Sequence, residues 1–164
     1  MSETRATAGH VTAPVSKATL TAWLEAEGFS VEPHEASNDH QAWATLANYD
    51  DIVLQVIRHK AHPLISLVAR TSLGDNDQAA LSALDPDALA RFIYTFRRRA
   101  FQDGDIGLEL DWPKGQALQS WTLDLRLYDD APITQQSLHV ATRRLLTRHL
   151  ELIDELRLAL THGV

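Results

Sequence analysis

Histidine pairs and short acidic clusters are the residues whose types and spacing could bind a metal ion. Two residues separate His59 from His62, but no third ligand follows at a typical spacing, so we expect a solvated loop rather than a zinc site. Asp75-Asn76-Asp77 and Asp103-Gly104-Asp105 resemble fragments of calcium loops. Each lacks the run of oxygen ligands and the closing glutamate, so both are predicted to be turns. The sequence therefore predicts no metal site.

The usual signatures of catalysis are also missing. Cysteine is absent, which removes disulfides, thiolate nucleophiles and cysteine-ligated metals. No nucleophile elbow, phosphate-binding loop, dinucleotide fingerprint or His-Glu-x-x-His motif occurs. We therefore expect a non-enzymatic protein without a cofactor, although a small hydrolase or transferase stays open.

Arg97-Arg98-Arg99 is the strongest basic run in the chain. With Arg91 it could hold a phosphate or an acidic segment of a partner. Alternatively these arginines end a helix, where cations stabilise the helix dipole and their stems cover apolar surface, and we favour this interpretation. The net charge of −7 opposes sequence-independent binding to nucleic acid, so no direct contact with nucleic acid is expected.

The chain has the length and composition of one globular domain, with 164 residues of which 45% are hydrophobic. Residues 1–15 show no apolar period and are predicted to be a disordered tail, followed by a single domain over residues 16–164. No apolar run approaches the ~20 residues that span a bilayer, and no secretory signal follows the first residues. We expect a cytoplasmic protein that does not contact membranes.

Helices are predicted from caps and apolar spacing. The first begins after Ser16 and ends at Gly28. Asp85-Pro86 begins a second, whose apolar stripe is Leu89, Phe92, Ile93 and Phe96, and a shorter helix over residues 78–84 precedes it. The last runs from Thr134 to about Leu160.

Strands are predicted where apolar residues alternate or cluster. Brief extended segments lie near residues 29–33 and 42–47, a hairpin joins residues 52–57 to 64–71, and residues 106–112 pair with 121–128. The apolar run 52–57 indicates a strand covered on both faces. The predicted class is α+β, with an antiparallel sheet of about five strands in the order α-β-β-β-α-β-β-α. The expected core residues are Leu54, Val56, Leu67, Phe92, Ile93, Phe96, Leu108, Leu110, Leu123, Leu125, Leu145 and Leu152.

The last helix has an unusually broad apolar face. At 100° per residue, eight apolar side chains fall in an arc of roughly 160°. They are Leu138, Leu145, Leu146, Leu150, Leu152, Ile153, Leu156 and Leu160. Because an arc of about 100° suffices to cover one sheet, the surplus indicates a second internal element or another chain, and we predict a homodimer. His149 lies within the arc and is predicted to be a hydrogen-bonded core histidine.

The order of elements resembles the type III secretion chaperone-like fold shared with the YbjN family. The resemblance covers about Ser16 to Leu160. It depends on the step from the first helix into Gly28-Phe29-Ser30-Val31, on Phe92-Ile93-Tyr94-Thr95-Phe96, and on the late strand pair ending in Tyr128. The Ala-rich stretch from residue 37 to residue 48 and the long final helix depart from it. The resemblance implies a homodimer that binds another protein without doing chemistry on it.

The predicted function is a chaperone-like adaptor that holds a segment of a partner protein against an apolar surface. The candidate contact residues are Leu20, Trp23 and Leu24 on the first helix, with Trp43 and Leu46 nearby. Each of them could instead be core, since apolar stripes at helical spacing usually face inward. The alternative is a helix-grip protein that encloses a small apolar ligand, with Trp112, Trp121 and Tyr128 at its cavity.

Overall fold

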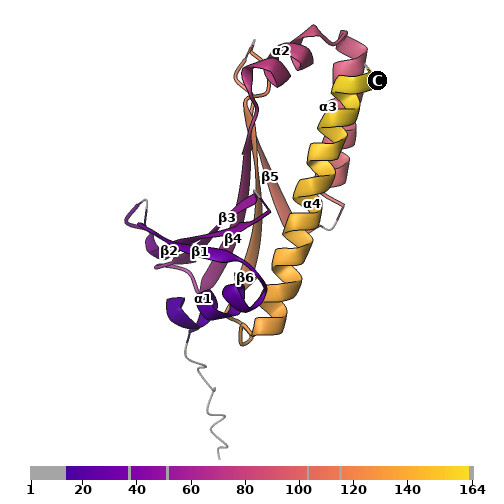
Figure 1. The fold of residues 1–164 in the computed structure, drawn as a ribbon. Coiled ribbons are helices and arrows are strands. Elements are labelled where there is room, and N and C mark those ends of the chain that lie inside the picture. Colours follow the sequence, from indigo (N-terminus) through magenta and orange to yellow (C-terminus); the bar gives the residue numbers. More distant parts are fainter. Residues whose placement is uncertain (1–13, 37, 51, 103, 115, 163–164) are drawn as a thin grey trace, which may run out of the picture.

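A computed structural model describes residues 14–162 except 37, 51, 103 and 115 (Figure 1). In chain order its elements are α1 (Lys17–Ala26), β1 (Ser30–His34), β2 (Gln41–Tyr49), β3 (Ile52–His59), β4 (Leu64–Ser72), α2 (Asp75–Ala83), α3 (Pro86–Ala100), β5 (Ile106–Asp111), β6 (Ser120–Tyr128) and α4 (Gln135–His162). The predicted α+β class is confirmed. Most of the predicted disordered tail lies outside the described residues, and Pro14 and Val15 lead directly into α1.

The sheet has six strands rather than the predicted five. Its order is β1-β2-β3-β4-β6-β5, and every neighbouring pair is antiparallel. The two segments before the central hairpin are full strands that pair with each other and extend the sheet to an edge. Their pattern is weak because β1 is mostly exposed and β2 carries small buried residues, Ala44 and Ala47.

Two helical features differ from expectation. Asp75-Asn76-Asp77 is the first turn of α2 and not a separate turn, and acidic residues there are stabilised by the positive end of the helix dipole. The last helix matches its predicted span within two residues at each end. No helix in the described part of the chain is long and apolar enough to cross a bilayer.

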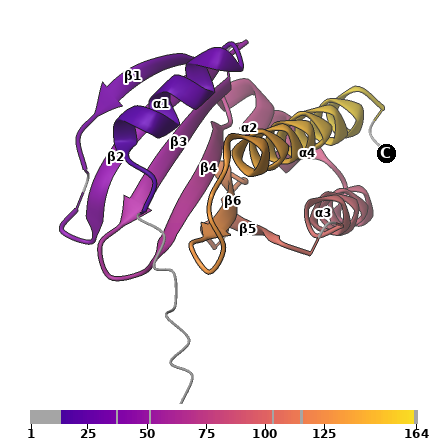
Figure 2. The same cartoon turned by 90° about the horizontal axis from the view of Figure 1, so that it is seen from below.

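The helices are gathered on one face of the sheet. Figure 2 shows α1 and α4 on this face, with α3 beside α4. Buried side chains from all four helices join a single core with the facing residues of the strands. Within the described residues no helix covers the opposite face, so the prediction that the strand at residues 52–57 is covered on both faces is wrong. On the outer side of this strand, Val53 is exposed and Ile57 is buried.

The core follows the alternation predicted for the strands. Most of the expected core residues are buried, whereas Ile93, Leu108 and Leu110 are half-buried at its margin. His149 is buried, as predicted. Leu150 was expected in the apolar arc of the last helix but is 49% exposed, because it lies at the edge of that arc. The broad arc is used to cover both the sheet and α3.

Candidate functional site

Helix α3 is held at both ends by interactions that follow from its sequence. The Asp85 carboxylate accepts hydrogen bonds from the backbone N–H groups of Asp87 and Ala88, at 3.0 and 2.9 Å, and caps the helix. Near the other end, the Arg99 guanidinium donates to the Glu155 carboxylate of α4 at 2.9 Å. This hydrogen bond, together with the negative charge of Glu155, raises the pKa of Arg99.

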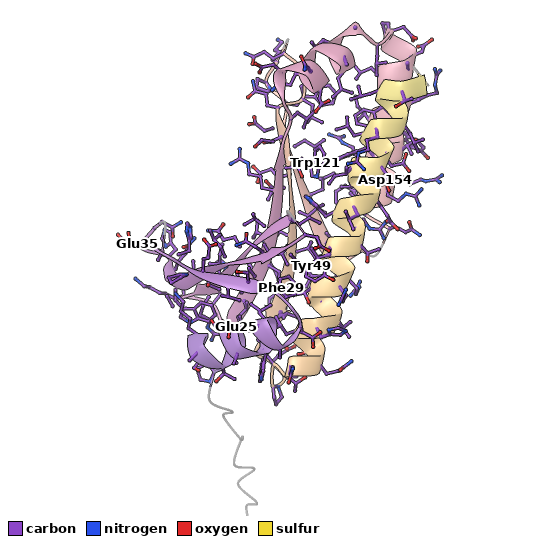
Figure 3. All side chains as sticks on the ribbon, in the orientation of Figure 1. Glu25, Phe29, Glu35, Tyr49, Trp121 and Asp154 are labelled. Atoms are coloured by element: carbon purple, nitrogen blue, oxygen red, sulfur yellow. The ribbon has the colours of Figure 1, made fainter. Side chains whose placement is uncertain are left out.

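The rotation of α3 about its axis is set by a chain of aromatic contacts. The ring centroids of Phe92 and Phe96 are 5.3 Å apart, and Phe96 meets Trp121 edge-on at 5.1 Å. Figure 3 shows Trp121 between the sheet and α4. With these rings inward, the opposite side of α3 faces solvent, and Tyr94 is 67% and Phe101 52% exposed.

The exposed side of α3 forms a shallow apolar hollow. We call it the α3 surface and define it by its lining residues, Ala90, Ile93, Tyr94, Arg97, Arg98 and Phe101. The hollow is contiguous and mostly apolar, whereas exposed apolar residues that are scattered singly need no explanation. Phe101 also lines a neighbouring hollow that extends over β5 and β6 to Tyr128. The α3 surface is therefore the candidate binding site.

The three consecutive arginines have two different environments. All three lie in the last turn of α3, as predicted. Arg99 is paired with Glu155, which fits the structural interpretation. Arg97 and Arg98 are exposed on the α3 surface, and within the described residues neither pairs with a carboxylate. The second interpretation, an anion-binding role, is thus open to these two arginines.

The structure separates the five contact residues proposed from the sequence. Leu20 and Leu24 are fully buried in the core beneath α1. Trp23 is half-buried and lines a small hollow with a few neighbours near the start of α4. That hollow is lined by Pro14, Val15, Trp23, Asp129, Ala131, Pro132 and Ile133. Burial removes Leu20 and Leu24 from any surface in this conformation, and Trp23 stays accessible.

Trp43 and Leu46 lie on opposite faces of the sheet. Trp43 pairs with Arg58 on the helix-covered face and packs against the core. Leu46 pairs with Gln55 on the other face, in a hollow that crosses several strands. The residues lining this hollow are His34, Leu46, Val53, Gln55, Val68, Arg70 and Thr122, and we call them the outer sheet surface. The five predicted residues thus form no common site.

The aromatic residues of the ligand-binding alternative are also dispersed. Trp121 is fully buried against Phe96, and Tyr128 lies on the outer side of the sheet beside the hollow shared with Phe101. The Trp112 indole donates to the backbone carbonyl of Gln116 at 2.8 Å. The three side chains therefore do not face a shared cavity.

The histidines singled out by the sequence have local partners. The His59 imidazole hydrogen-bonds the Ser66 hydroxyl at 3.0 Å, and burial, followed by the nearby charge of Arg126, lowers the pKa of His59. Ser66 is buried. His62 is exposed. Within the described residues no group of three potential ligands could hold a metal ion.

His149 is a second buried histidine, close to Trp121. Its Nε2 atom is 3.1 Å from the Thr71 hydroxyl, and the two rings are 6.4 Å apart between centroids. Its Nδ1 atom and the Trp121 Nε1 atom are buried without a hydrogen-bond partner among the described residues. Burial lowers the pKa of His149, because the surroundings solvate the charged form poorly.

Sequence reasoning missed Tyr94 and Phe101. The inward stripe of α3 was identified correctly through Phe92 and Phe96, but the aromatic residues off that stripe were given no binding role. The available signal was an aromatic residue opposite the stripe with arginines nearby, since Tyr94 is followed three and four positions later by Arg97 and Arg98.

The fold has known counterparts, although sequence comparison finds none. No family model and no curated protein matches the sequence. A crystal structure of an uncharacterized protein from Methanothermobacter thermautotrophicus matches with a TM-score of 0.75 and 22% identity, covering 87% of this chain and 97% of the other. The crystal structure of YbjN from E. coli matches with a TM-score of 0.51 and 13% identity, covering 88% and 91%. The fold is YbjN-like. At these identities the similarity extends to the fold alone.

Proposed function

We propose that this protein is a non-enzymatic, chaperone-like adaptor that holds a segment of a partner protein on the α3 surface. The observation that carries the proposal is the exposure of two aromatic residues, Tyr94 and Phe101, in one apolar hollow. A few residues carry most of the binding energy of a protein interface, and tyrosine and arginine are enriched among them. The YbjN-like fold is compatible with this role. A cytoplasmic location, expected from the sequence, remains a prediction.

A pair of matched variants tests the proposal. Tyr94→Ala combined with Phe101→Ala removes the aromatic residues of the α3 surface. Val53→Ala combined with Tyr128→Ala removes two comparably exposed apolar residues from the outer side of the sheet instead. Both variants should keep the thermal midpoint of the wild type, because exposed side chains contribute little to stability.

The measurement is partner capture from a native extract, followed by quantitative mass spectrometry. Proteins enriched by the wild type should be lost with the α3 variant and retained with the outer-sheet variant, Val53→Ala with Tyr128→Ala. Light scattering on all three proteins separates loss of capture from a change in self-association. Equal enrichment by the wild type and the α3 variant would show that the α3 surface is not the binding site.

We also propose that the chain is a homodimer. The support is that α4, after covering the sheet and α3, still leaves Val140, Leu150 and Leu158 exposed. Light scattering with an in-line column should give about twice the chain mass of 18.3 kDa. A monomer at micromolar concentration would contradict this proposal without affecting the proposed adaptor role.

A further inference from the structure

The charge of the α3 surface differs from that of the whole protein. The chain carries a net charge of −7, yet the lining of this hollow contains two arginines and no acidic residue. Arg97 and Arg98 have no carboxylate partner among the described residues. Their neighbour Arg99 shows the contrast, because it is held by Glu155.

The neighbouring hollow that shares Phe101 has a different balance of charge. The one arginine that lines it, Arg126, is paired with an acidic residue. Arg126 donates a hydrogen bond to the Asp124 carboxylate at 2.9 Å. The Asp105 carboxylate accepts hydrogen bonds from both terminal nitrogens of Arg144. The α3 surface thus offers guanidinium groups that are available to an incoming carboxylate.

The dimensions of the α3 surface suit a helical ligand. The lining runs along α3 from Ala90 to Phe101, the residue that follows the helix, and eleven steps of helix extend over about 16 Å. A partner helix of about three turns would cover this length with apolar residues at positions i, i+3 or i+4, and i+7. Arg97 and Arg98 lie between the two aromatic residues, where they can reach acidic residues that border such an apolar face.

We propose that the α3 surface selects an amphipathic helical segment of a partner protein whose apolar face is bordered by Asp or Glu. This inference rests on the proposed adaptor function and specifies the chemistry of the partner. Arginine binds carboxylates through two parallel hydrogen bonds, which gives orientation as well as affinity. A second copy of the α3 surface is a poor ligand, because two facing copies would bring together four arginines with no acidic residue in either lining.

Two synthetic peptides of 15 residues test the chemistry directly. Both carry the same apolar face of Leu and Phe and the same helix-forming background, and they differ only in having Glu or Lys at the bordering positions. Binding to the full chain is measured by fluorescence anisotropy at low and at high salt. We expect the Glu peptide to bind at least ten-fold more tightly than the Lys peptide at low salt, with the difference shrinking as salt screens the charges.

Three variants assign this preference to the α3 surface. Arg97→Gln with Arg98→Gln should lower the affinity for the Glu peptide about ten-fold. Arg97→Glu with Arg98→Glu should reverse the preference, so that the Lys peptide binds more tightly. Tyr94→Ala with Phe101→Ala should lower the affinity for both peptides. The control, Lys60→Glu with Lys114→Glu, makes the same change in net charge at exposed positions outside the hollow and should leave the preference unchanged.

Each contrary result has a distinct meaning. Equal binding of both peptides, lost in the aromatic variant, would overturn the acidic specificity and leave the α3 surface as the partner site. Binding that is insensitive to the aromatic variant would overturn both the inference and the proposed site. A dimer that becomes a monomer when Tyr94 and Phe101 are replaced would show that a second copy occupies the surface, which also overturns the inference.

Discussion

Acidification should destabilise the protein through His149. Its Nδ1 atom is buried without a partner, and burial lowers its pKa relative to the unfolded value of 6.5. The unfolded chain therefore binds this proton more readily than the folded chain, and stability is lost as the pH falls below about 6.5. Between pH 7.5 and pH 5.5 the unfolded imidazole goes from mostly neutral to mostly charged, so the loss approaches about 1.4 kcal/mol if the folded imidazole stays neutral.

The assay compares urea unfolding of the wild type and His149→Gln at pH 7.5, 6.5 and 5.5. Glutamine retains a group that can hydrogen-bond Thr71 but does not titrate in this range. The other titrating groups, His59 included, are common to both proteins and cancel in the difference. The stability advantage of the wild type should shrink by up to about 1.4 kcal/mol toward pH 5.5. Parallel pH profiles would refute the reasoning, because they would mean that His149 titrates equally in both states.

Three further substitutions test the fold by urea denaturation. Leu123→Ala should cost about 2–5 kcal/mol, because the side chain is fully buried in β6 between β4 and β5. Thr122→Ala on the outer face should cost under about 1 kcal/mol, and similar losses would mean that the wrong face is inward. Asp85→Ala removes the cap of α3 and should cost about 0.5–2 kcal/mol, with Asp85→Asn nearly neutral as the control. Gly28→Ala should cost about 1–2 kcal/mol through backbone strain at φ 90°, since the nearest side chain leaves room for a methyl group; no loss would place this turn in another conformation.

The parts of the fold that could be predicted are those with strong local patterns. Alternation identified β5 and β6 and their inward faces, and the Asp85-Pro86 pair located the start of α3. The early strands were harder to predict. An edge strand such as β1 needs little apolar surface, and β2 buries small residues that give only a weak apolar pattern in the sequence. Pairing between strands distant in sequence, such as β4 with β6, leaves no local signal at all.

The candidate site was largely beyond sequence reasoning for a related physical reason. Leu20 and Trp23 belong to the same apolar stripe of α1, yet only the packed structure shows that the first is buried and the second accessible. Leu46 was grouped with Trp43 by proximity along the chain, but the two are three residues apart in a regular stretch of β2, and the alternation of the strand places them on opposite faces. Exposure depends on which neighbours cover a residue, and this is a property of the tertiary fold.

The two edge strands restrict how a partner can be recognised. Unpaired backbone groups at a sheet edge can accept an additional strand, and such edges also cause aggregation when they are long and apolar. Pro33 leaves β1 without one N–H group, and β5 is short and carries the exposed charges of Glu109 and Asp111. Both edges are therefore poor templates for strand addition. The partner proposed for the α3 surface would then be recognised mainly through its side chains, so its affinity should follow its sequence closely and should not extend to every unfolded chain.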